Sequence, residues 1–402
     1  MNHEERLIVL PSLRAPLLPD GRVIVTRKFL EGMAEYAAHW DGPVQAVLEP
    51  CAAATDNLDN VTVVPAELPF DLHVLAFDDE RIAERIAAAA VVLGGADHRQ
   101  NHLAGLCRKL GTAYVVNTEY SLQTRKQIAA AEERNPLRRW RRYVWESGQE
   151  RAVLRSIDQA AGVQCNGLPT YAAYRDRNPR TLLYFDTRTT ADLLPDEESL
   201  AARLAPLVGG APLRLLFSGR LIAMKGADHL PRFAAELRRR GVPFVLTICG
   251  AGALEAAVRK EVAESDLAGK VIFKGALDFK TQLLPLVKRE IDLFVCPHRQ
   301  GDPSCTYLET LACGVPIVGY ANEAWSGLAA LGDFGSVVPL DDPAALARAV
   351  ARLHDDRETL ARRSLAAWQF AVDHTFEQTF LRRIEHLRQC ASIESRQVAS
   401  VE

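Results

Sequence analysis

Short apolar runs rich in β-branched residues alternate along the chain with longer amphipathic stretches. In the first half of the chain the runs are residues 7–10, 44–48, 61–64, 91–93, 113–116 and 162–165. Strands that alternate with helices at this spacing are typical of a parallel sheet covered by helices. The alternation restarts in the second half, with runs at residues 213–218, 244–249, 271–274, 293–297, 316–319 and 336–339. The pattern therefore predicts an α/β protein with two Rossmann-like, doubly wound parallel-sheet domains.

Proline and glycine residues interrupt the pattern between the two halves. They are Pro195, Pro206, Gly209, Gly210 and Pro212. Such residues mark loops, and 402 residues are too many for one ordinary hydrophobic core. We expect a first domain over residues 1–205 and a second over residues 206–374. Residues 375–402 are expected to form a C-terminal helix that crosses back to the first domain and frays at its end.

The composition is that of a globular protein, and it narrows the range of partners. Hydrophobic residues make up 48%, charged residues 25%, and the formal net charge is −3, so nothing calls for a nucleic-acid partner. The eight cysteines form no C-x-x-C pair and no cluster with histidine at zinc-ligand spacing, so we expect no metal site. The N-terminus lacks the layout of a signal peptide. We predict a cytoplasmic protein, and peripheral attachment to the inner face of a membrane stays open.

The segment Phe217–Gly226 combines a strand end, a glycine turn and two cations. Open α/β sheets bind ligands at the carboxyl ends of such strands, where backbone can approach a pyrophosphate. Arg220 and Lys225, beside Gly219, are therefore candidates for a diphosphate clamp. Solvated loop charges are the alternative interpretation.

Two further strand ends carry weaker signals. Gly250 begins a Gly-x-Gly turn after one strand, which is compatible with nucleotide approach but is as often a plain tight turn. Lys274 ends the next strand, where main-chain groups can read the edge of a nucleobase. We expect Gly250 and Lys274 to contact a bound nucleotide.

The most specific segment covers residues 292–318 and reads as strand, polar loop, short helix and strand. The start of the helix contains Ser304, Cys305 and Thr306, whose free N–H groups and positive dipole end suit a phosphate. Glu309, early in the helix, is well placed to accept hydrogen bonds from ribose hydroxyls. A carboxylate that only compensates the helix dipole is the alternative role.

Together these segments resemble the donor half of retaining GT-B glycosyltransferases of family four, the glycosyl transferases group 1. Gly219-Arg220 and Lys225-Gly226 match the first signature of that family, and residues 309–318 match the second part of its later one. The first Glu of that later signature is replaced by Gly301, and the nearest carboxylate is Asp302. The resemblance spans about residues 213–353.

The resemblance implies two domains that face a cleft, with the acceptor bound by the first and the donor by the second. The reaction would transfer a sugar from a nucleoside diphosphate sugar to a hydroxyl with retention, without metal or cofactor, in polysaccharide or glycoconjugate synthesis. Arg220 and Lys225 would stabilise the departing diphosphate. The sugar would be held by Asp302 or by backbone N–H groups of its loop. A sugar-nucleotide epimerase and a non-catalytic nucleotide-binding subunit are the alternatives.

Two segments of the first domain bear on the acceptor. Glu119 and Tyr120 follow a strand end where the family often places a sugar-contacting residue, although a helix cap at Thr118 explains the segment equally well. Residues 138–143 (Arg-Arg-Trp-Arg-Arg-Tyr) are basic and aromatic, a composition that can contact an anionic membrane or a lipid-linked acceptor. A solvated helix face is the other interpretation. The acceptor is predicted to be lipid-linked or an oligosaccharide.

Overall fold

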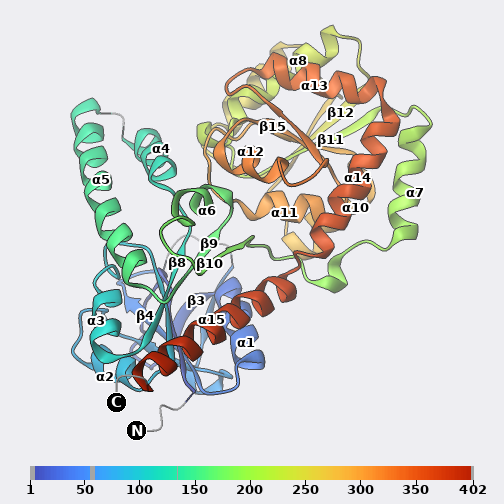
Figure 1. Cartoon of the computed structure of the whole chain (residues 1–402). Helices are drawn as coiled ribbons and strands as arrows, with labels where there is room; N and C mark the ends of the chain where they lie inside the picture. The colour runs from blue at the N-terminus through green and yellow to red at the C-terminus, as the bar shows by residue number, and fades with distance from the viewer. Residues whose placement is uncertain (1–4, 55–58, 134, 400–402) are drawn as a thin grey trace. The chain divides into compact units, whose positions relative to one another are not determined.

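The computed structural model describes residues 5–54, 59–133 and 135–399. The chain forms two compact units (Figure 1). The first contains the residues up to Lys126, Leu137–Tyr184 and the chain from Glu377 onward, and the second contains Gln127–Pro136 and Phe185–Phe376. Each unit is described separately below.

The main sheet of the first unit is parallel, with the strand order β10-β9-β8-β7-β1-β4-β2 and with β6 also paired to β4. Its strands are β1 (Leu7–Leu10), β2 (Arg14–Ala15), β4 (Val44–Pro50), β6 (Asp71–Val74), β7 (Val91–Gly95), β8 (Ala113–Thr118), β9 (Gly162–Asn166) and β10 (Thr181–Tyr184). The inner strands β1, β7 and β9 are buried along their whole length. Sheets covered by helices on both faces show such unbroken apolar runs.

One predicted strand of this sheet lies elsewhere. β5 (Asn60–Val63) pairs antiparallel with β3 (Val23–Thr26) in a separate two-stranded sheet. β5 is only partly buried and exposes Thr62, unlike the fully buried central strands. The position beside β4 is taken instead by β6, whose register is set by pairs such as Leu72 with Ala46.

Helices cover the first sheet and include the C-terminal segment. They are α1 (Arg27–His39), η1 (Pro65–Glu67), α2 (Arg81–Ala87), α3 (Leu103–Leu110), α5 (Pro136–Gln159), α6 (Leu168–Tyr174) and α15 (Phe376–Ala399). The helix α4 (Leu122–Glu132) begins in the first unit, and its residues from Gln127 onward are counted in the second. α15 is held on β9 by the backbone and side chain of Arg383. The Arg383 carbonyl accepts from Nε2 of Gln164 at 2.9 Å, and the guanidinium Nε donates to Oε1 of the same residue at 2.8 Å.

The second unit has a six-stranded parallel sheet in the order β13-β12-β11-β14-β15-β16. Its strands are β11 (Leu213–Ser218), β12 (Phe244–Cys249), β13 (Val271–Gly275), β14 (Leu293–Cys296), β15 (Ile317–Tyr320) and β16 (Gly335–Val338). From β11 the chain first builds the sheet toward β13 and then returns to add β14 on the other side of β11. The order therefore reverses between β11 and β14, and the carboxyl ends of strands at such a switch point are where open α/β sheets bind ligands.

The helices of the second unit begin earlier than the sequence pattern suggests. They are η2 (Ala191–Leu193), α7 (Glu197–Val208), η3 (Ala223–Lys225), η4 (Ala227–His229), α8 (Leu230–Arg239), α9 (Glu255–Glu264), η5 (Phe279–Leu283), α10 (Leu284–Glu290), α11 (Cys305–Ala312), α12 (Glu323–Ala329), α13 (Pro343–Asp355) and α14 (Arg357–Val372). The division at Tyr184 differs from the predicted boundary at residue 205, because α7 packs into the second core through Leu200 and Leu207. Pro206 lies within that helix and does not end it.

No helix among the described residues is both long and apolar enough to cross a membrane. The longest helices, α5 and α15, carry many charged residues.

Candidate active site

Glycines join the loops that follow β11, β12 and β13. The N–H of Gly219 donates to the carbonyl of Cys249 at 3.0 Å, and the N–H of Gly250 donates to the carbonyl of Gly275 at 2.6 Å. Gly250 has φ 126°, and a Cβ there would lie 2.0 Å from the Gly219 carbonyl oxygen. Only glycine fits this contact. Gly219 and Gly250, both expected on the donor side, thus bring these two strand ends together.

A second close approach joins the loop after β11 to the end of β14. Gly226, between η3 and η4, has φ 67°, and a Cβ there would lie 2.0 Å from the carbonyl oxygen of Pro297. The preceding residue, Lys225, reaches Asp302 in the loop after β14. Its Nζ lies 2.8 Å from Oδ2 and 3.2 Å from Oδ1. The structure therefore pairs two candidate residues that the sequence analysis assigned to different groups of the donor.

The Lys225–Asp302 pair is largely withdrawn from solvent. The side chains are 10% and 18% exposed. Partial burial strengthens the attraction between the charges but also penalises either charge left alone. Lys225 has three N–H donors, so an ammonium held by one carboxylate retains donor capacity for a ligand oxygen.

The start of α11 lies just after this pair. Ser304 is the N-cap residue, but its side chain makes no capping hydrogen bond, and its Oγ bonds Oγ1 of Thr306 at 3.2 Å. The Ser304 N–H donates to the carbonyl of Asp302 at 2.8 Å and fixes the turn into the helix. Cys305 begins the helix, and its Sγ lies 3.6 Å from Oδ2 of Asp186. All three predicted residues at the helix start are partly buried.

Glu309 is buried and is held by an arginine that the sequence analysis did not single out. Nε of Arg188 lies 2.6 Å from Oε1 and Nη2 lies 3.1 Å from Oε2, a two-pronged ion pair. The guanidinium carbon also lies 4.0 Å from the ring centroid of Phe279. Arg188 follows β10 in a stretch without any motif, so no local signal could have identified it. Because each carboxylate oxygen has a second lone pair, this contact still leaves Glu309 able to accept hydrogen bonds.

Two predicted donor cations face solvent. Arg220, in the loop after β11, and Lys274, in β13, are both exposed. Neither forms an ion pair with another residue in the described part of the chain. Their charges are therefore available to a ligand, whereas Lys225 is already engaged with Asp302.

A buried histidine lies under the site. His298, two residues beyond β14, is 1% exposed, and neither ring nitrogen has a hydrogen-bond partner among the described residues. Its ring contacts Phe217 at 6.3 Å and Tyr307 at 5.9 Å between centroids. Burial, and secondarily the charge of Lys225, lowers the pKa of His298 well below its usual value. The ring is neutral at physiological pH.

The candidate residues of the first unit lie at the end of β8. Glu119 and Tyr120 directly follow this strand and are both exposed. Within the described ranges there is no group of three or more His, Cys, Asp or Glu side chains that could hold a metal ion.

Comparison with known proteins shows which family part of this chain resembles. Residues 207–369 match the family described as "Glycosyl transferases group 1". Over its whole length the fold is similar to Anabaena HepE, solved in complex with UDP, with a TM-score of 0.67, 13% identity, and coverage of 94% of this chain and 98% of that chain. Residues 207–369 are thus similar to the glycosyl transferases group 1 family, as the motifs predicted, and the fold of two parallel-sheet α/β domains matches GT-B glycosyltransferase structures.

Two curated relatives illustrate the sequence similarity. A GDP-mannose-dependent α-(1-6)-phosphatidylinositol monomannoside mannosyltransferase of Mycolicibacterium smegmatis is 29% identical over 42% of this chain and 45% of its own length. The lipopolysaccharide core biosynthesis mannosyltransferase LpsB of Rhizobium meliloti is 35% identical over 28% of this chain and 31% of its own. The chain therefore matches less than half the length of these relatives.

Proposed function

We propose that this protein is a retaining glycosyltransferase that moves a sugar from a nucleoside diphosphate sugar to a hydroxyl acceptor. The observation that carries the proposal is the Lys225–Asp302 pair, set beside the start of α11 at the switch point of the second sheet. There Lys225, the proposed cation for the diphosphate, directly contacts Asp302, the proposed carboxylate for the sugar. The similarity of the same segment to the family supports this assignment.

The diphosphate is the leaving group, and its negative charge grows as the bond to the sugar breaks. Lys225 and Arg220 supply positive charge to it, and the N–H groups at Ser304, Cys305 and Thr306 add the positive end of α11. Stabilisation that increases in the transition state accelerates the step. Asp302 has two roles in this proposal: it orients the ammonium of Lys225, and it accepts a hydroxyl hydrogen bond from the donor sugar.

The nucleoside occupies the side of α11 where Glu309 lies. Glu309 accepts hydrogen bonds from the ribose hydroxyls, and Arg188 fixes the plane of its carboxylate. Gly219 and Gly250 keep the strand ends close enough for main-chain contact with the nucleotide, and Lys274 lies next to the edge of the base. UDP and GDP are the first donors to test, because HepE was solved with UDP and the Mycolicibacterium relative is named as GDP-mannose-dependent.

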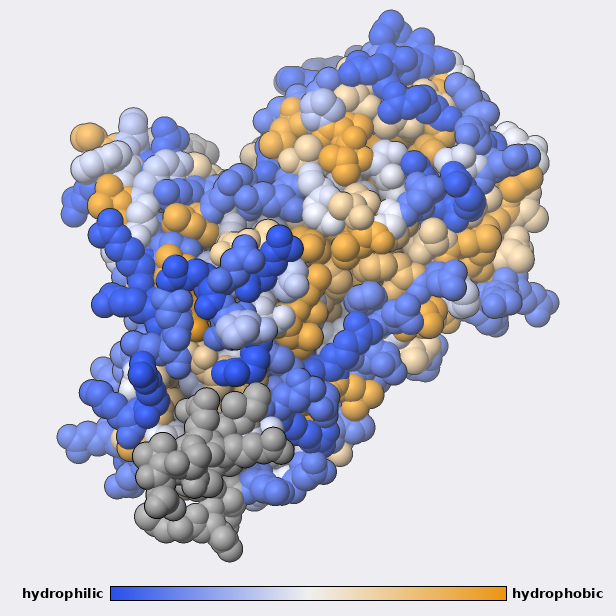
Figure 2. All heavy atoms as spheres, in the orientation of Figure 1, coloured by the Kyte–Doolittle hydropathy of each residue, from blue (hydrophilic) through white to orange (hydrophobic). Residues whose placement is uncertain are grey.

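The first unit is proposed to bind the acceptor, with Glu119 and Tyr120 on the acceptor side. The start of α5 supports a lipid-linked acceptor or a membrane contact. Leu137, Trp140 and Val144 are 74%, 64% and 54% exposed, at the three- and four-residue spacing of one helix face. Arginines 138, 139, 141 and 142 accompany this apolar row, and Figure 2 shows hydrophobic surface at the outer end of α5. An exposed apolar row with basic neighbours fits the surface of an anionic membrane.

The test of the proposal is turnover of donor with and without an acceptor. UDP- and GDP-linked sugars are incubated with the protein and with a lipid or oligosaccharide acceptor fraction, and release of the nucleoside diphosphate is measured. We expect release that depends on acceptor. A changed nucleotide sugar without acceptor would indicate the epimerase alternative, and nucleotide binding without any turnover would indicate a non-catalytic subunit.

A further inference from the structure

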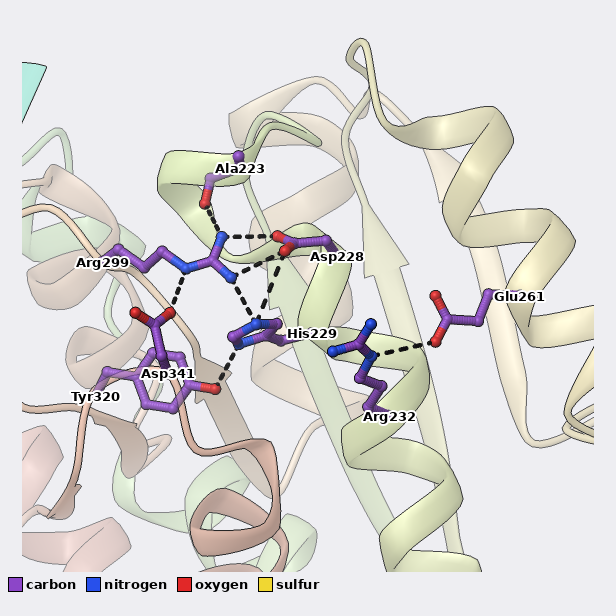
Figure 3. Close-up of polar contacts among 8 residues, drawn as sticks. All are labelled: Ala223, Asp228, His229, Arg232, Glu261, Arg299, Tyr320 and Asp341. Carbon is purple, nitrogen blue, oxygen red and sulfur yellow. Dashed lines mark hydrogen bonds and ion pairs between the residues drawn. The ribbon is translucent and has the colours of Figure 1, made fainter. Parts of the chain in front are cut away.

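Arg299 lies at the centre of a polar network beside the site (Figure 3). Nε donates to Oδ1 of Asp341 at 2.5 Å, and Nη1 donates to Oδ1 of Asp228 at 2.8 Å and to the carbonyl of Ala223 at 2.5 Å. Nη2 donates to Oδ2 of Asp228 at 2.9 Å and to Nε2 of His229 at 2.6 Å. A guanidinium has five N–H donors, and here each has an acceptor.

The same network fixes the state of His229. A guanidinium can only donate, so Nε2 of His229 accepts from Arg299, and Nδ1 carries the proton toward the Tyr320 hydroxyl at 2.8 Å. Burial, followed by the charge of Arg299, lowers the pKa of His229, in agreement with a neutral ring. The negative charges of Asp228 and Asp341 oppose this shift, and Arg232 adds to it.

The network joins the carboxyl ends of four adjacent strands. Ala223, Asp228 and His229 lie in the loop after β11, Arg299 in the loop after β14, Tyr320 at the end of β15 and Asp341 after β16. These strands are neighbours in the sheet. Asp341 takes the left-handed conformation, with φ 58°, which is uncommon for a residue with a side chain. The turn after β16 thus presents its carboxylate to Arg299.

We propose that Arg299 is a positioning residue that sets the distance between Lys225 and Asp302. The backbone N–H of Arg299 donates to the carbonyl of Met224 at 2.9 Å, and Met224 directly precedes Lys225. Asp302 follows three residues after Arg299, and the guanidinium anchors both Ala223 and Asp228 on either side of Lys225. Arg299 therefore connects the two loops whose ends carry the pair.

A lysine cannot replace this contact, because it lacks the planar fork that binds Asp228 with two bonds and reaches Asp341 from its third nitrogen. Arg299→Lys keeps the positive charge and removes that geometry. The chain offers a matched control at the amino ends of β11 and β14, the same two strands. Arg214, at the start of β11, binds Asp292, before β14, through Nε at 3.1 Å and Nη2 at 2.6 Å.

The first experiment measures the accessibility of Lys225 without any nucleotide. The full chain is labelled with an amine-reactive reagent, and the labelling rate of each lysine is followed by peptide mass spectrometry. In the wild type and in Arg214→Lys, we expect Lys225 to react more slowly than the exposed Lys274. In Arg299→Lys, we expect the rate at Lys225 to rise several-fold toward that of Lys274. Equal protection of Lys225 in both variants would overturn the proposal.

The second experiment measures UDP and GDP affinity by calorimetry and rests on the proposed function. We expect Arg299→Lys to weaken binding and Arg214→Lys to leave it unchanged, although both lower the melting temperature. Asp228→Asn keeps the shape of the side chain but loses the charge and replaces one of the two acceptor oxygens by an NH2 donor, and it is expected to fall between them. Weakened binding in Arg214→Lys to the same degree would show a merely structural role for Arg299. A wild type that binds neither nucleotide would defeat the proposed function, and the labelling result would still decide the role of Arg299.

Discussion

Lys225 and Asp302 form an ion pair of 2.8 Å between Nζ and Oδ2, although 77 positions separate them in the sequence. The close approach of Gly226 to Pro297 brings their two loops together. The departure of Asp302 from the family signature, which has a Glu one position earlier, therefore comes with a defined partner. The predictions below test what this pair and its neighbours do.

Asp302→Asn is expected to reduce sugar transfer by about one to two orders of magnitude, because a charge-assisted hydrogen bond to the sugar is lost. Affinity for the bare nucleoside diphosphate should change little, since Lys225 keeps its charge and the asparagine side chain keeps one oxygen that can accept from its ammonium. Initial rates and calorimetry measure the two quantities. Full transferase activity would make Asp302 only a partner of Lys225, and an equal loss of nucleotide affinity would place it at the diphosphate.

Glu309→Gln is expected to weaken nucleotide binding by roughly 1.5 to 3 kcal/mol, the typical worth of hydrogen bonds to a charged group. It also leaves Arg188 without its ion pair, so the melting temperature of the ligand-free protein should fall somewhat. Arg188→Gln is the comparison, because it removes the same ion pair and keeps the carboxylate. If both variants lost stability equally and bound nucleotide normally, Glu309 would be structural.

The sequence analysis singled out candidate site residues that lie in continuous segments, and it did not single out residues whose contacts depend on folding. Lys225 and Glu309 stand in local motifs with glycine turns and helix starts, which physical rules and family resemblance recognise. Arg188 reaches Glu309 across 121 positions from an irregular stretch, so nothing beside it signals a role. Arg299 reads in the sequence as one loop charge among many, and only the sheet order shows that its acceptors lie at neighbouring strand ends.

The same distinction between local and long-range information applies to the prediction of the fold. The alternation of strands and helices predicted the two-sheet class, because hydrophobic periodicity is local. Partners of individual strands are not local, so β5 was expected in the parallel sheet and pairs instead with β3. The boundary was placed by proline and glycine content, yet α7 continues past Pro206 because its apolar face packs on the second core.

His298 predicts a pH effect on stability. Its pKa is lowered well below 6.5 in the folded protein, so the unfolded chain binds a proton more readily as the pH falls below 6.5. The contribution of the neutral ring to the free energy of unfolding is fully present above pH 6.5. It declines below that pH, by up to about 1.4 kcal/mol per pH unit. His298→Leu should lose less stability than the wild type between pH 7.5 and pH 5 in urea unfolding. Parallel pH curves would contradict the buried neutral ring.

The start of α5 predicts recruitment to membranes. Liposomes with anionic lipid should bind the protein, and added salt should weaken binding as screening increases. Replacing the arginines at 138, 139, 141 and 142 by glutamine should abolish binding, while Trp140→Ala should weaken it without removing its salt dependence. Equal binding to neutral liposomes, or none to anionic ones, would show that this surface is a solvated helix face.

The central claim is that the second unit holds a nucleoside diphosphate through Lys225 and Arg220, and calorimetry tests it most directly. UDP, GDP and dTDP are titrated into the wild type, Lys225→Ala, Arg220→Ala and Lys260→Ala, the last a control on α9 whose side chain is 76% exposed. The account predicts that at least one nucleotide binds the wild type and the control equally. It predicts a loss of about 1.5 to 3 kcal/mol in each of the other two variants. Unchanged affinity in both Lys225→Ala and Arg220→Ala, or no binding to the wild type, would contradict it.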